Sequence, residues 1–288
     1  MNGATPSNGS TPISSIDFNY IRALVYRESS IVLDDSKTYL VNSRLLPIAR
    51  AAGVSSVGPL ISLLQSKPFG DLHQRVVEAV ATTETSFFRD VHPFTALRDH
   101  VIPELVQLRQ SGSRTLNIWS AACSSGQEPH SIAMILKDKF PQLHDWDLQL
   151  LASDISRTML ARARQGTYTQ LEVNRGLPAP YLVRFFSQNE DSWQLDREVR
   201  EMFRFFEQNI AAAWKALPPI DLLVMRNVLI YFDVSTRRKV LNKVKEVLRP
   251  GGYLLLGSAE TTLNLDESFA RVRVGRAIFY RISKGDAK

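Results

Sequence analysis

The sequence predicts an α/β protein with a Rossmann-like sheet, preceded by a small helical domain and interrupted by a small antiparallel β subdomain. After residue 110, short apolar runs alternate with helical patterns, which is typical of a parallel sheet covered by helices. The runs are "LNIWSAA", "LQLLASD", "DLLVMRN" and "GYLLLGS". The helical patterns follow Gln127, Ser156 and Val234.

The end of the chain predicts a hairpin instead of another crossover. "RVRVGRAIFYRI" consists of two strand-like pieces around Gly275, so we expect the sheet to close with an antiparallel pair. This ending is unusual for a dinucleotide dehydrogenase. It resembles the seven-stranded sheet of class I S-adenosylmethionine-dependent methyltransferases, and we expect that fold for residues 96–288.

Residues 16–95 are expected to form the N-terminal helical domain, because their apolar residues recur at intervals of three and four. These positions are Ile21, Leu24, Val25, Leu40, Val41, Leu45, Leu60, Leu63 and Leu64. Pro47 is expected to start a new helix or to kink the existing one. Residues 1–15 are rich in Ser, Thr, Asn, Gly and Pro without apolar periodicity, which predicts a disordered leader.

The segment 181–206 interrupts the alternation of strands and helices. Its sequence, "YLVRFFSQNEDSWQLDREVREMFRFF", has aromatic, strand-prone pieces around a polar turn. We interpret it as the inserted antiparallel subdomain.

Composition excludes several classes of protein. With 288 residues, 44% of them hydrophobic, the chain can bury a full core. Its single cysteine, Cys123, excludes an intramolecular disulfide and a cysteine-rich metal site, and fits a reducing cytoplasm. The five histidines show no spacing that indicates a metal, so none is expected. The sequence contains no run of about 18 apolar residues, and its N-terminus lacks a signal-like pattern. We therefore expect neither membrane insertion nor export.

The net charge of +6 is unevenly distributed. Residues 36–70 contain Lys37, Arg44, Arg50 and Lys67 but no acidic residue. An acidic partner could dock on this segment, and the plain alternative is a solvated basic face. Nucleic acid is disfavoured, because no long basic run or interleaved aromatic pattern is present.

A turn of small residues follows the first predicted strand in "NIWSAACSSGQEPHSIAMIL". Its one glycine, Gly126, does not satisfy the G-x-G-x-x-G pattern of dinucleotide enzymes. The turn could admit an adenosyl ligand or could be only a tight strand–helix connection. Asp154 ends the next run, where a carboxylate can accept hydrogen bonds from ribose hydroxyls. The alternative for Asp154 is an N-cap of the helix that begins near Ser156.

Two further motifs place polar groups beside apolar ones. In "TTETSFFRD", residues 82–90, the simplest interpretation is an aromatic core anchor beside an exposed Arg89. "MRNVLIYF" places Arg226, Asn227 and Tyr231 at the end of a buried strand, where ligand-binding residues of this fold class lie.

Five ordered motifs together resemble the CheR family, the chemotaxis receptor glutamate O-methyltransferases, over about Asp17 to Ser283. They are "TTETSFFRD", "WSAACSSGQEP", "ASDIS", "RNVLIYFD" and "GGYLLLGSAE". The resemblance implies S-adenosylmethionine as methyl donor and methyl-accepting chemotaxis receptors as partners. We therefore expect a cytoplasmic enzyme, and a monomer.

The resemblance also implies site residues. Cofactor contacts of the family fall on Thr83, Thr85, Arg89, Glu128, Asp154, Asn209, Ile210, Arg226 and Asn227. Tyr231 matches a residue close to the transferred methyl, so Arg89 and Tyr231 are the expected catalytic residues. The chain departs from the family at Thr83, where asparagine is common, and at Gln127, where glutamate is common. We expect Gln127 to be only a first-turn helix residue.

The inserted subdomain departs from the family as well. Members that bind a C-terminal receptor pentapeptide have a glycine-rich loop there, whereas "FFSQNEDSWQLDREV" has no glycine. We expect independence from that tether. Receptor docking is expected on Lys37, Arg44 and Arg50 instead. Two rival functions are a noncatalytic ligand sensor and a nucleic-acid methyltransferase, the second disfavoured because "RNVLIY" replaces an N/D-P-P-Y motif.

Overall fold

The computed structural model describes residues 13–283 and separates into two compact units, Met1–Thr82 and Thr83–Lys288. Residues 1–12, most of the expected leader, lie outside the described residues. The units divide earlier than the expected boundary at residue 95. The physical reason is that Phe87 and Phe88 are buried in the core of the second unit.

The first unit is helical, as its apolar spacing predicted. Its elements are α1 (Ser15–Ser29), η1 (Asp35–Lys37), α2 (Thr38–Ala51), α3 (Val57–Gln65) and α4 (Asp71–Val80). The spaced residues Ile21, Leu45 and Leu60 are completely buried, so this face of the helices forms the core. Pro47 lies inside α2, where no helix begins or ends.

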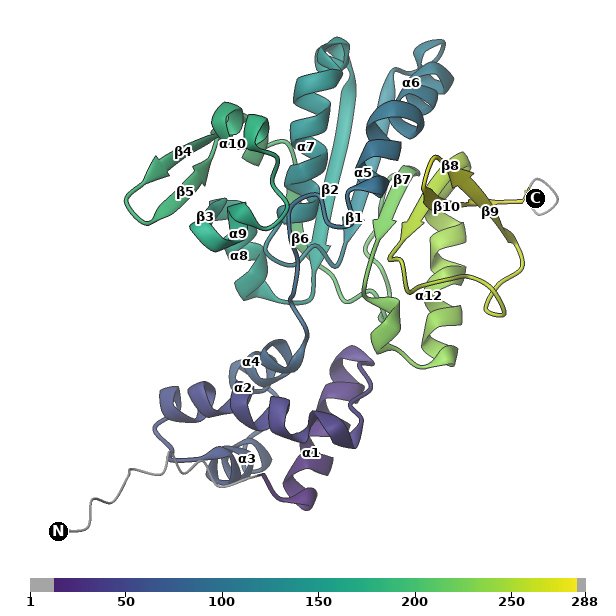
Figure 1. Ribbon diagram of the computed structural model, residues 1–288. Coiled ribbons are helices and arrows are strands. Elements are labelled where there is room, and N and C mark those ends of the chain that lie inside the picture. Colours follow the sequence, from purple (N-terminus) through teal and green to yellow (C-terminus); the bar gives the residue numbers. More distant parts are fainter. Residues whose placement is uncertain (1–12, 284–288) are drawn as a thin grey trace. The chain divides into compact units, whose positions relative to one another are not determined.

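The second unit contains a seven-stranded sheet in the order β6-β2-β1-β7-β8-β10-β9, which confirms the predicted methyltransferase-like architecture (Figure 1). Its strands are β1 (Thr115–Ala121), β2 (Asp147–Asp154), β6 (Arg204–Glu207), β7 (Ile220–Met225), β8 (Leu248–Leu256), β9 (Phe269–Val274) and β10 (Ala277–Ile282). The strands from β6 to β8 pair in parallel. β10 pairs antiparallel with β8 and β9, as the sequence of the final hairpin predicted.

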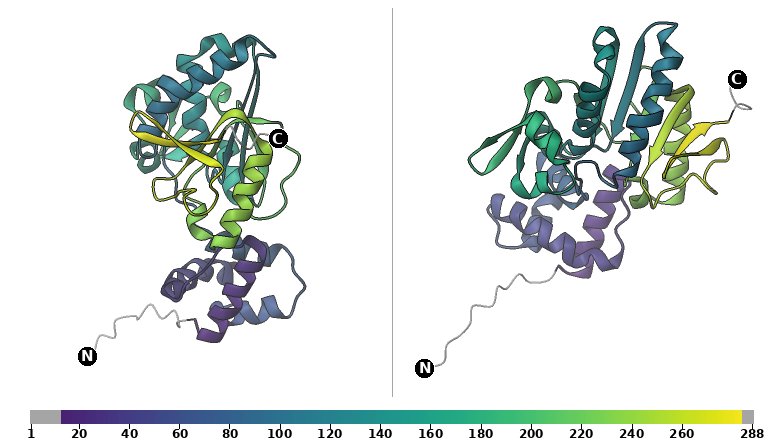
Figure 2. Two further views of the ribbon diagram at one scale, coloured as in Figure 1. Left: turned by 90° about the vertical axis from the view of Figure 1, so that its right-hand side faces the viewer. Right: turned by 45° about the horizontal axis from the view of Figure 1, so that its top comes forward.

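Helices cover both faces of this sheet (Figure 2). The helical segments of the second unit around this sheet are α5 (His92–Ala96), η2 (Leu97–Val101), α6 (Ile102–Gln110), α7 (Gln127–Lys139), η3 (Pro141–Asp145), α8 (Arg157–Gln165), the short turn η4 (Leu229–Tyr231) and α12 (Val234–Val247). Apolar side chains of α6, α7 and α8 share one core with Ile118 of β1 and Val224 of β7. α12 lies on the other face, where Val240 and Leu241 are completely buried.

The small antiparallel subdomain is present, but its extent differs from the expected 181–206. Its sheet has the order β3-β5-β4, with β3 (Thr167–Thr169), β4 (Phe186–Asn189) and β5 (Ser192–Leu195). The accompanying helices are α9 (Gln170–Asn174), α10 (Ala179–Phe185) and α11 (Arg197–Arg200).

Two parts of the predicted insertion are therefore corrected. The piece from Tyr181 to Phe185 is helical, because Pro180 in the first turn of α10 fixes a helical φ where no N–H bond is needed. Arg204–Glu207 pairs with β2 and is the edge strand of the main sheet. Over residues 13–283, the helices are too short or too polar to cross a membrane.

Candidate functional site

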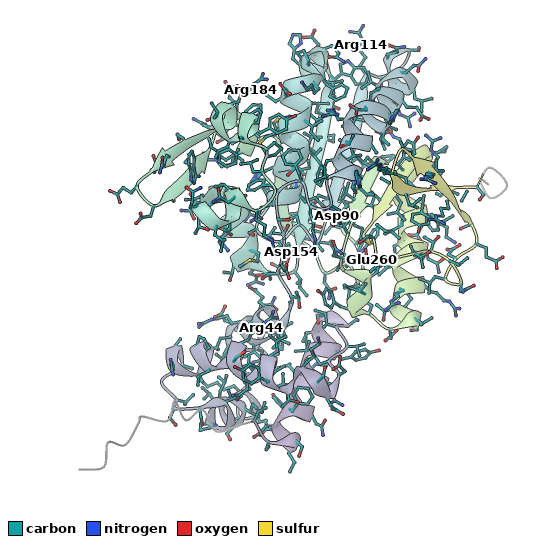
Figure 3. All side chains as sticks on the ribbon, viewed as in Figure 1. Arg44, Asp90, Arg114, Asp154, Arg184 and Glu260 are labelled. Atoms are coloured by element: carbon teal, nitrogen blue, oxygen red, sulfur yellow. The ribbon has the colours of Figure 1, made fainter. Side chains whose placement is uncertain are left out.

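The site lies at the carboxyl edge of the sheet, where the neighbouring parallel strands β1, β2 and β7 end. Their last residues are Ala121, Asp154 and Met225. Because parallel strands end at the same edge, the loops that follow them meet there. Figure 3 shows Asp154, Asp90 and Glu260 in this part of the unit.

The loop between β1 and α7 has an unusual backbone. Ala122, Ser124 and Gly126 have positive φ values of 60°, 50° and 91°. A Cβ at Gly126 would lie 2.8 Å from the Cβ of Ala163 in α8, so both the conformation and the space favour glycine. Small residues here let α8 approach the loop closely, which was not foreseen from the turn alone.

Asp154 fastens this loop to the end of β2. Its Oδ2 accepts a 2.8 Å hydrogen bond from the Ser124 N–H, and its Oδ1 accepts a 2.9 Å bond from the Ser156 N–H. The N-cap of α8 is Ser156 itself, whose Oγ accepts from the Met159 N–H. The N-cap alternative for Asp154 is therefore wrong.

A charge cluster around the buried Arg226, the residue after β7, includes Glu128 of α7 and the more exposed Asp90 before α5. Nη1 of Arg226 lies 3.2 Å from Oε2 of Glu128, and its Nη2 lies 2.6 Å from Oδ2 of Asp90. The other oxygen of Glu128 accepts a 2.8 Å bond from the Ser120 hydroxyl. Burial raises the pKa of Glu128, and the Arg226 guanidinium opposes that rise. Sequence reasoning gave Asp90 no role, although it ends the "TTETSFFRD" motif.

The two expected catalytic side chains are only lightly engaged. The Arg89 side chain is partly exposed, and its one hydrogen bond to residues 13–283 runs from Nη1 to the Glu84 carbonyl oxygen, at 3.1 Å. Tyr231 is also partly exposed, and its hydroxyl has no hydrogen bond to the described residues. Both side chains thus keep polar groups available to a ligand.

The remaining expected contacts lie around this edge. The Thr83 carbonyl oxygen accepts a 2.6 Å bond from the Ser124 hydroxyl, while its side chain and that of Thr85 are partly exposed. Asn209 follows β6, and its Oδ1 accepts from the Ala211 N–H. Ile210 is buried, and its carbonyl oxygen accepts a 2.6 Å bond from Nζ of Lys243.

Other polar residues of the β1–α7 region are internal. Burial raises the pKa of the Cys123 thiol, which keeps it uncharged. Gln127 is the first residue of α7, and its Oε1 accepts from the Ser125 hydroxyl. Burial lowers the pKa of His130 to about 3, and its Nδ1 lies 2.7 Å from the Tyr168 hydroxyl.

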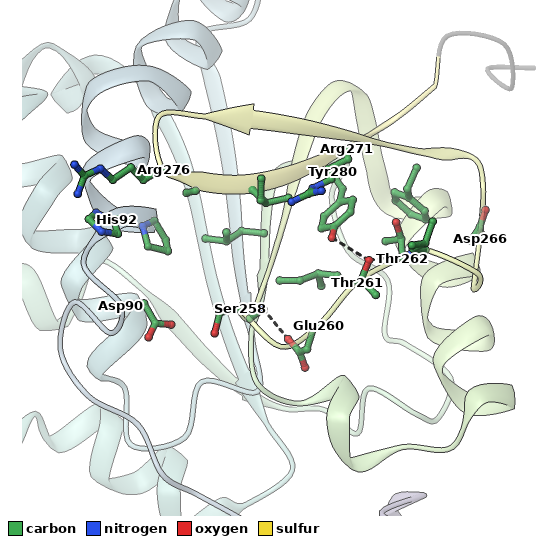
Figure 4. A pocket seen from close by; sticks show the side chains of 18 of the residues that line it. Asp90, His92, Ser258, Glu260, Thr261, Thr262, Asp266, Arg271, Arg276 and Tyr280 are labelled. Carbon is green, nitrogen blue, oxygen red and sulfur yellow. Dashed lines mark hydrogen bonds between the residues drawn. The ribbon is translucent and has the colours of Figure 1, made fainter.

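A groove of about 780 Å³ adjoins the site under the β9–β10 hairpin (Figure 4). Its lining includes Asp90 and Glu260 on the site side, and Arg271, Arg276 and Tyr280 on the hairpin. No local sequence pattern predicts this groove, because distant segments of the chain form it.

In the first unit, the three expected docking residues differ in their surroundings. Lys37 and Arg50 are exposed. Nη1 of Arg44 donates hydrogen bonds of 2.8 and 3.0 Å to the carbonyl oxygens of Val80 and Ala81, at the end of α4. Arg44 therefore holds the end of α4, and its docking role stays a prediction together with those of Lys37 and Arg50.

The sheet order and the strand-end cluster define a class I methyltransferase that binds S-adenosylmethionine. The chain belongs to the CheR methyltransferase family. Residues 83–278 match the model of the CheR methyltransferase SAM-binding domain, and residues 16–81 match that of the CheR all-alpha domain.

Curated relatives cover nearly the whole chain. Chemotaxis protein methyltransferase Cher2 of Pseudomonas putida is 36% identical over 93% of this chain and 98% of its own. Chemotaxis protein methyltransferase 1 of Pseudomonas aeruginosa is 37% identical over the same shares. The Escherichia coli chemotaxis protein methyltransferase is 33% identical over 89% of this chain and 88% of its own.

The residues present fit S-adenosylmethionine, the cofactor of this family. A strand-end carboxylate, Asp154, suits a ribose diol, and the glycine-dependent loop at Gly126 provides a narrow backbone turn beside it. Nε of Arg226 is buried without a hydrogen-bond partner among the described residues. A buried cationic group of this kind suits a ligand with a carboxylate.

Proposed function

We propose that this enzyme methylates the side-chain carboxylate of specific glutamates on cytoplasmic helices of chemotaxis receptors, forming glutamate methyl esters. The main structural support is the strand-end cluster of Arg226, Glu128 and Asp90. Beside it, Arg89 and Tyr231 have uncommitted polar groups. The names of the curated relatives support a chemotactic role. The cytoplasm is the corresponding place of action.

The proposed cofactor site is distributed over five segments of the second unit. Asp154 would hold the ribose, and Arg226 with Glu128 would orient the amino acid end. The other proposed contacts are Thr83, Thr85, Arg89, Asn209, Ile210 and Asn227. When bound, S-adenosylmethionine supplies a methyl group on a positively charged sulfur.

The acceptor needs no general base. A glutamate has a pKa near 4.3, so its carboxylate is ionised at neutral pH and can attack the methyl group directly. Opposite charges disappear during the attack, so a site shielded from water favours the transition state. Positioning is then the main task of the protein. In this proposal Arg89 orients a carboxylate, and Tyr231 lines the path of the methyl group.

The receptor helix would dock on the acid-free basic segment of the first unit, at Lys37 and Arg50. Both are exposed, whereas the bonds of Arg44 to the end of α4 limit its part. Receptor methylation regions are flanked by acidic and amide side chains, which a basic surface complements.

The enzyme is further proposed to act without a pentapeptide tether. The turn between β4 and β5 consists of Glu190 and Asp191 and has no glycine. A calorimetric titration with the receptor pentapeptide should give no binding. Micromolar binding would contradict this part of the proposal.

Methyl labelling tests the function. Receptor-containing membranes, the enzyme and methyl-labelled S-adenosylmethionine should give labelled receptor, and mild alkali should release the label as methanol, as expected of an ester. Arg89→Ala should abolish labelling, whereas Arg273→Ala, at an exposed arginine of β9, should not. Alkali-stable label, or normal labelling by Arg89→Ala, would contradict the proposal.

A further inference from the structure

Glu260 is a buried carboxylate in the "GSAE" segment after β8, and the mechanism above does not use it. Its Oε2 accepts hydrogen bonds from the N–H groups of Gly257 (2.7 Å) and Asn227 (2.8 Å). Its Oε1 accepts from the N–H groups of Val228 (2.8 Å) and Ile230 (3.3 Å). Figure 4 shows Glu260 at the edge of the groove with its bond toward Gly257.

Three of these four donors belong to the loop that carries Asn227 and Tyr231. The loop leaves β7 after Met225 with an irregular backbone, in which Asn227 has a φ of 58°. Positive φ is uncommon in residues other than glycine, although asparagine adopts it more readily than most, and contacts with surrounding groups stabilise it. The three hydrogen bonds that the Glu260 carboxylate accepts from N–H groups of this loop supply such contacts.

The packing around Gly257 leaves little freedom for this arrangement. A Cβ at Gly257 would lie 2.8 Å from the Asn227 N, from its Nδ2 and from Oε2 of Glu260. Glycine therefore allows the β8 loop to approach the β7 loop closely enough for Glu260 to reach three of its N–H groups. The two strand-end loops are fitted to each other through this contact.

We infer that Glu260 is a positioning residue, whose carboxylate fixes the backbone of residues 227–231 so that Asn227 and Tyr231 face the cofactor. This inference rests on the proposed roles of those two residues. It assigns Glu260 no contact with cofactor or substrate. Its effect on the reaction acts entirely through the loop.

Binding of S-adenosylhomocysteine and methyl transfer, measured on Glu260→Gln and Glu260→Asp, test the inference. Gln places an amide NH₂ against two N–H donors, so affinity and the rate per bound cofactor should fall on the order of tenfold to a hundredfold. Asp keeps the charge but is shorter, so its loss should be intermediate. Glu267→Gln, at an exposed glutamate of the same loop, is the control and should match the wild type.

A purely structural role gives a different result. Then Glu260→Gln would lower the fraction of protein that binds, while the Kd and the rate per binding site would stay at wild-type values. That result would overturn the inference. If Glu260→Gln does not fold, Glu260→Asp takes its place, and a wild-type Kd in that variant would overturn the inference too. The binding measurement needs no methyl acceptor, so failure of the wild type to label receptors would refute the proposed function alone.

Discussion

Two charge clusters, each with a buried central residue, lie at opposite ends of β7. At the amino end, the completely buried Asp221 accepts bonds from Nε of Arg109 (2.8 Å) and from the Asn117 N–H (2.9 Å), and pairs with Arg249 (3.0 Å). At the carboxyl end, Arg226 is the buried centre between Glu128 and Asp90. The first cluster is an acid between two bases, and the second is a base between two acids.

The two clusters differ in the features that make the carboxyl-end cluster our proposed site. The Asp221 cluster ties α6, β1, β7 and β8 together by regular elements. The Arg226 cluster lies where strands give way to loops with positive φ, next to side chains with uncommitted polar groups and to a groove. Both clusters thus have a buried, ion-paired central residue, and only the Arg226 cluster lies at the carboxyl edge of the sheet.

Removing the centre of the carboxyl-end cluster should have the largest effect. Arg226→Met leaves Glu128 buried without its cation, so the free energy of unfolding should fall by about 3–5 kcal/mol. Binding of S-adenosylhomocysteine should be lost as well. Urea unfolding and calorimetry measure the two effects, and a wild-type affinity in this variant would show that Arg226 takes no part in cofactor binding.

Removing the centre of the amino-end cluster should affect stability alone. Asp221→Asn leaves two arginines without their acid, so the free energy of unfolding should fall by about 3 kcal/mol. The Kd of the folded fraction for S-adenosylhomocysteine should equal that of the wild type. A tenfold weaker Kd would show that the two ends of β7 are not independent.

Asp154→Asn tests whether the hydrogen bonds of Asp154 to the loop after β1 support cofactor binding. The amide retains one oxygen but presents an NH₂ group to the N–H of Ser124 or Ser156. Leaving one buried donor unsatisfied should weaken cofactor binding by about 1–2 kcal/mol, with a similar loss of stability. Calorimetry and urea unfolding again provide the readout, and an unchanged Kd would remove Asp154 from the site.

His130 predicts a pH dependence. Its ring is buried and neutral, with a pKa lowered to about 3, whereas the unfolded chain takes up a proton near 6.5. Its contribution to stability is therefore present above pH 6.5 and is lost toward pH 3, by up to about 1.4 kcal/mol per pH unit.

Denaturant titrations at several pH values check this dependence. As the pH falls below 6.5, the free energy of unfolding of the wild type should decrease more steeply than that of His130→Asn, because asparagine takes up no proton on unfolding. His144→Asn, at an exposed histidine, should show no such change. Parallel pH profiles for wild type and His130→Asn would mean that His130 is not held neutral.

The smallest effect is expected in the first unit. Lys37→Glu with Arg50→Glu should raise the KM for receptor about two- to fivefold at low salt and less at high salt, since exposed charges steer association and are screened. The Kd for S-adenosylhomocysteine should not change. Equal loss of cofactor binding would argue against a docking role.

The sequence predicted what depends on local pattern. The apolar runs gave the main strands, and Gly275 gave the final hairpin. The recurrence of apolar residues at intervals of three and four predicted the buried faces of the helices in the first unit. These features follow from neighbouring residues, whose spacing determines which side of a helix or strand is buried.

What was missed depends on contacts between distant segments. The bonds of Arg44 to the end of α4 join residues 36 and 37 positions apart. Glu260 accepts hydrogen bonds from a loop about 30 residues earlier in the chain. Asp90 accepts one from Arg226, which lies 136 positions later. No local spacing encodes such pairs, although Asp90 and Glu260 both ended motifs that carried the family resemblance.

A crystal structure with S-adenosylhomocysteine would show whether the cofactor binds at the carboxyl edge of the sheet, as proposed. The ribose should lie within hydrogen-bond distance of Asp154, with the sulfur directed toward Tyr231 and the amino acid end toward Arg226. A nucleoside seated in the groove lined by Arg271 and Arg276, with no contact to Asp154 or Arg226, would contradict the account.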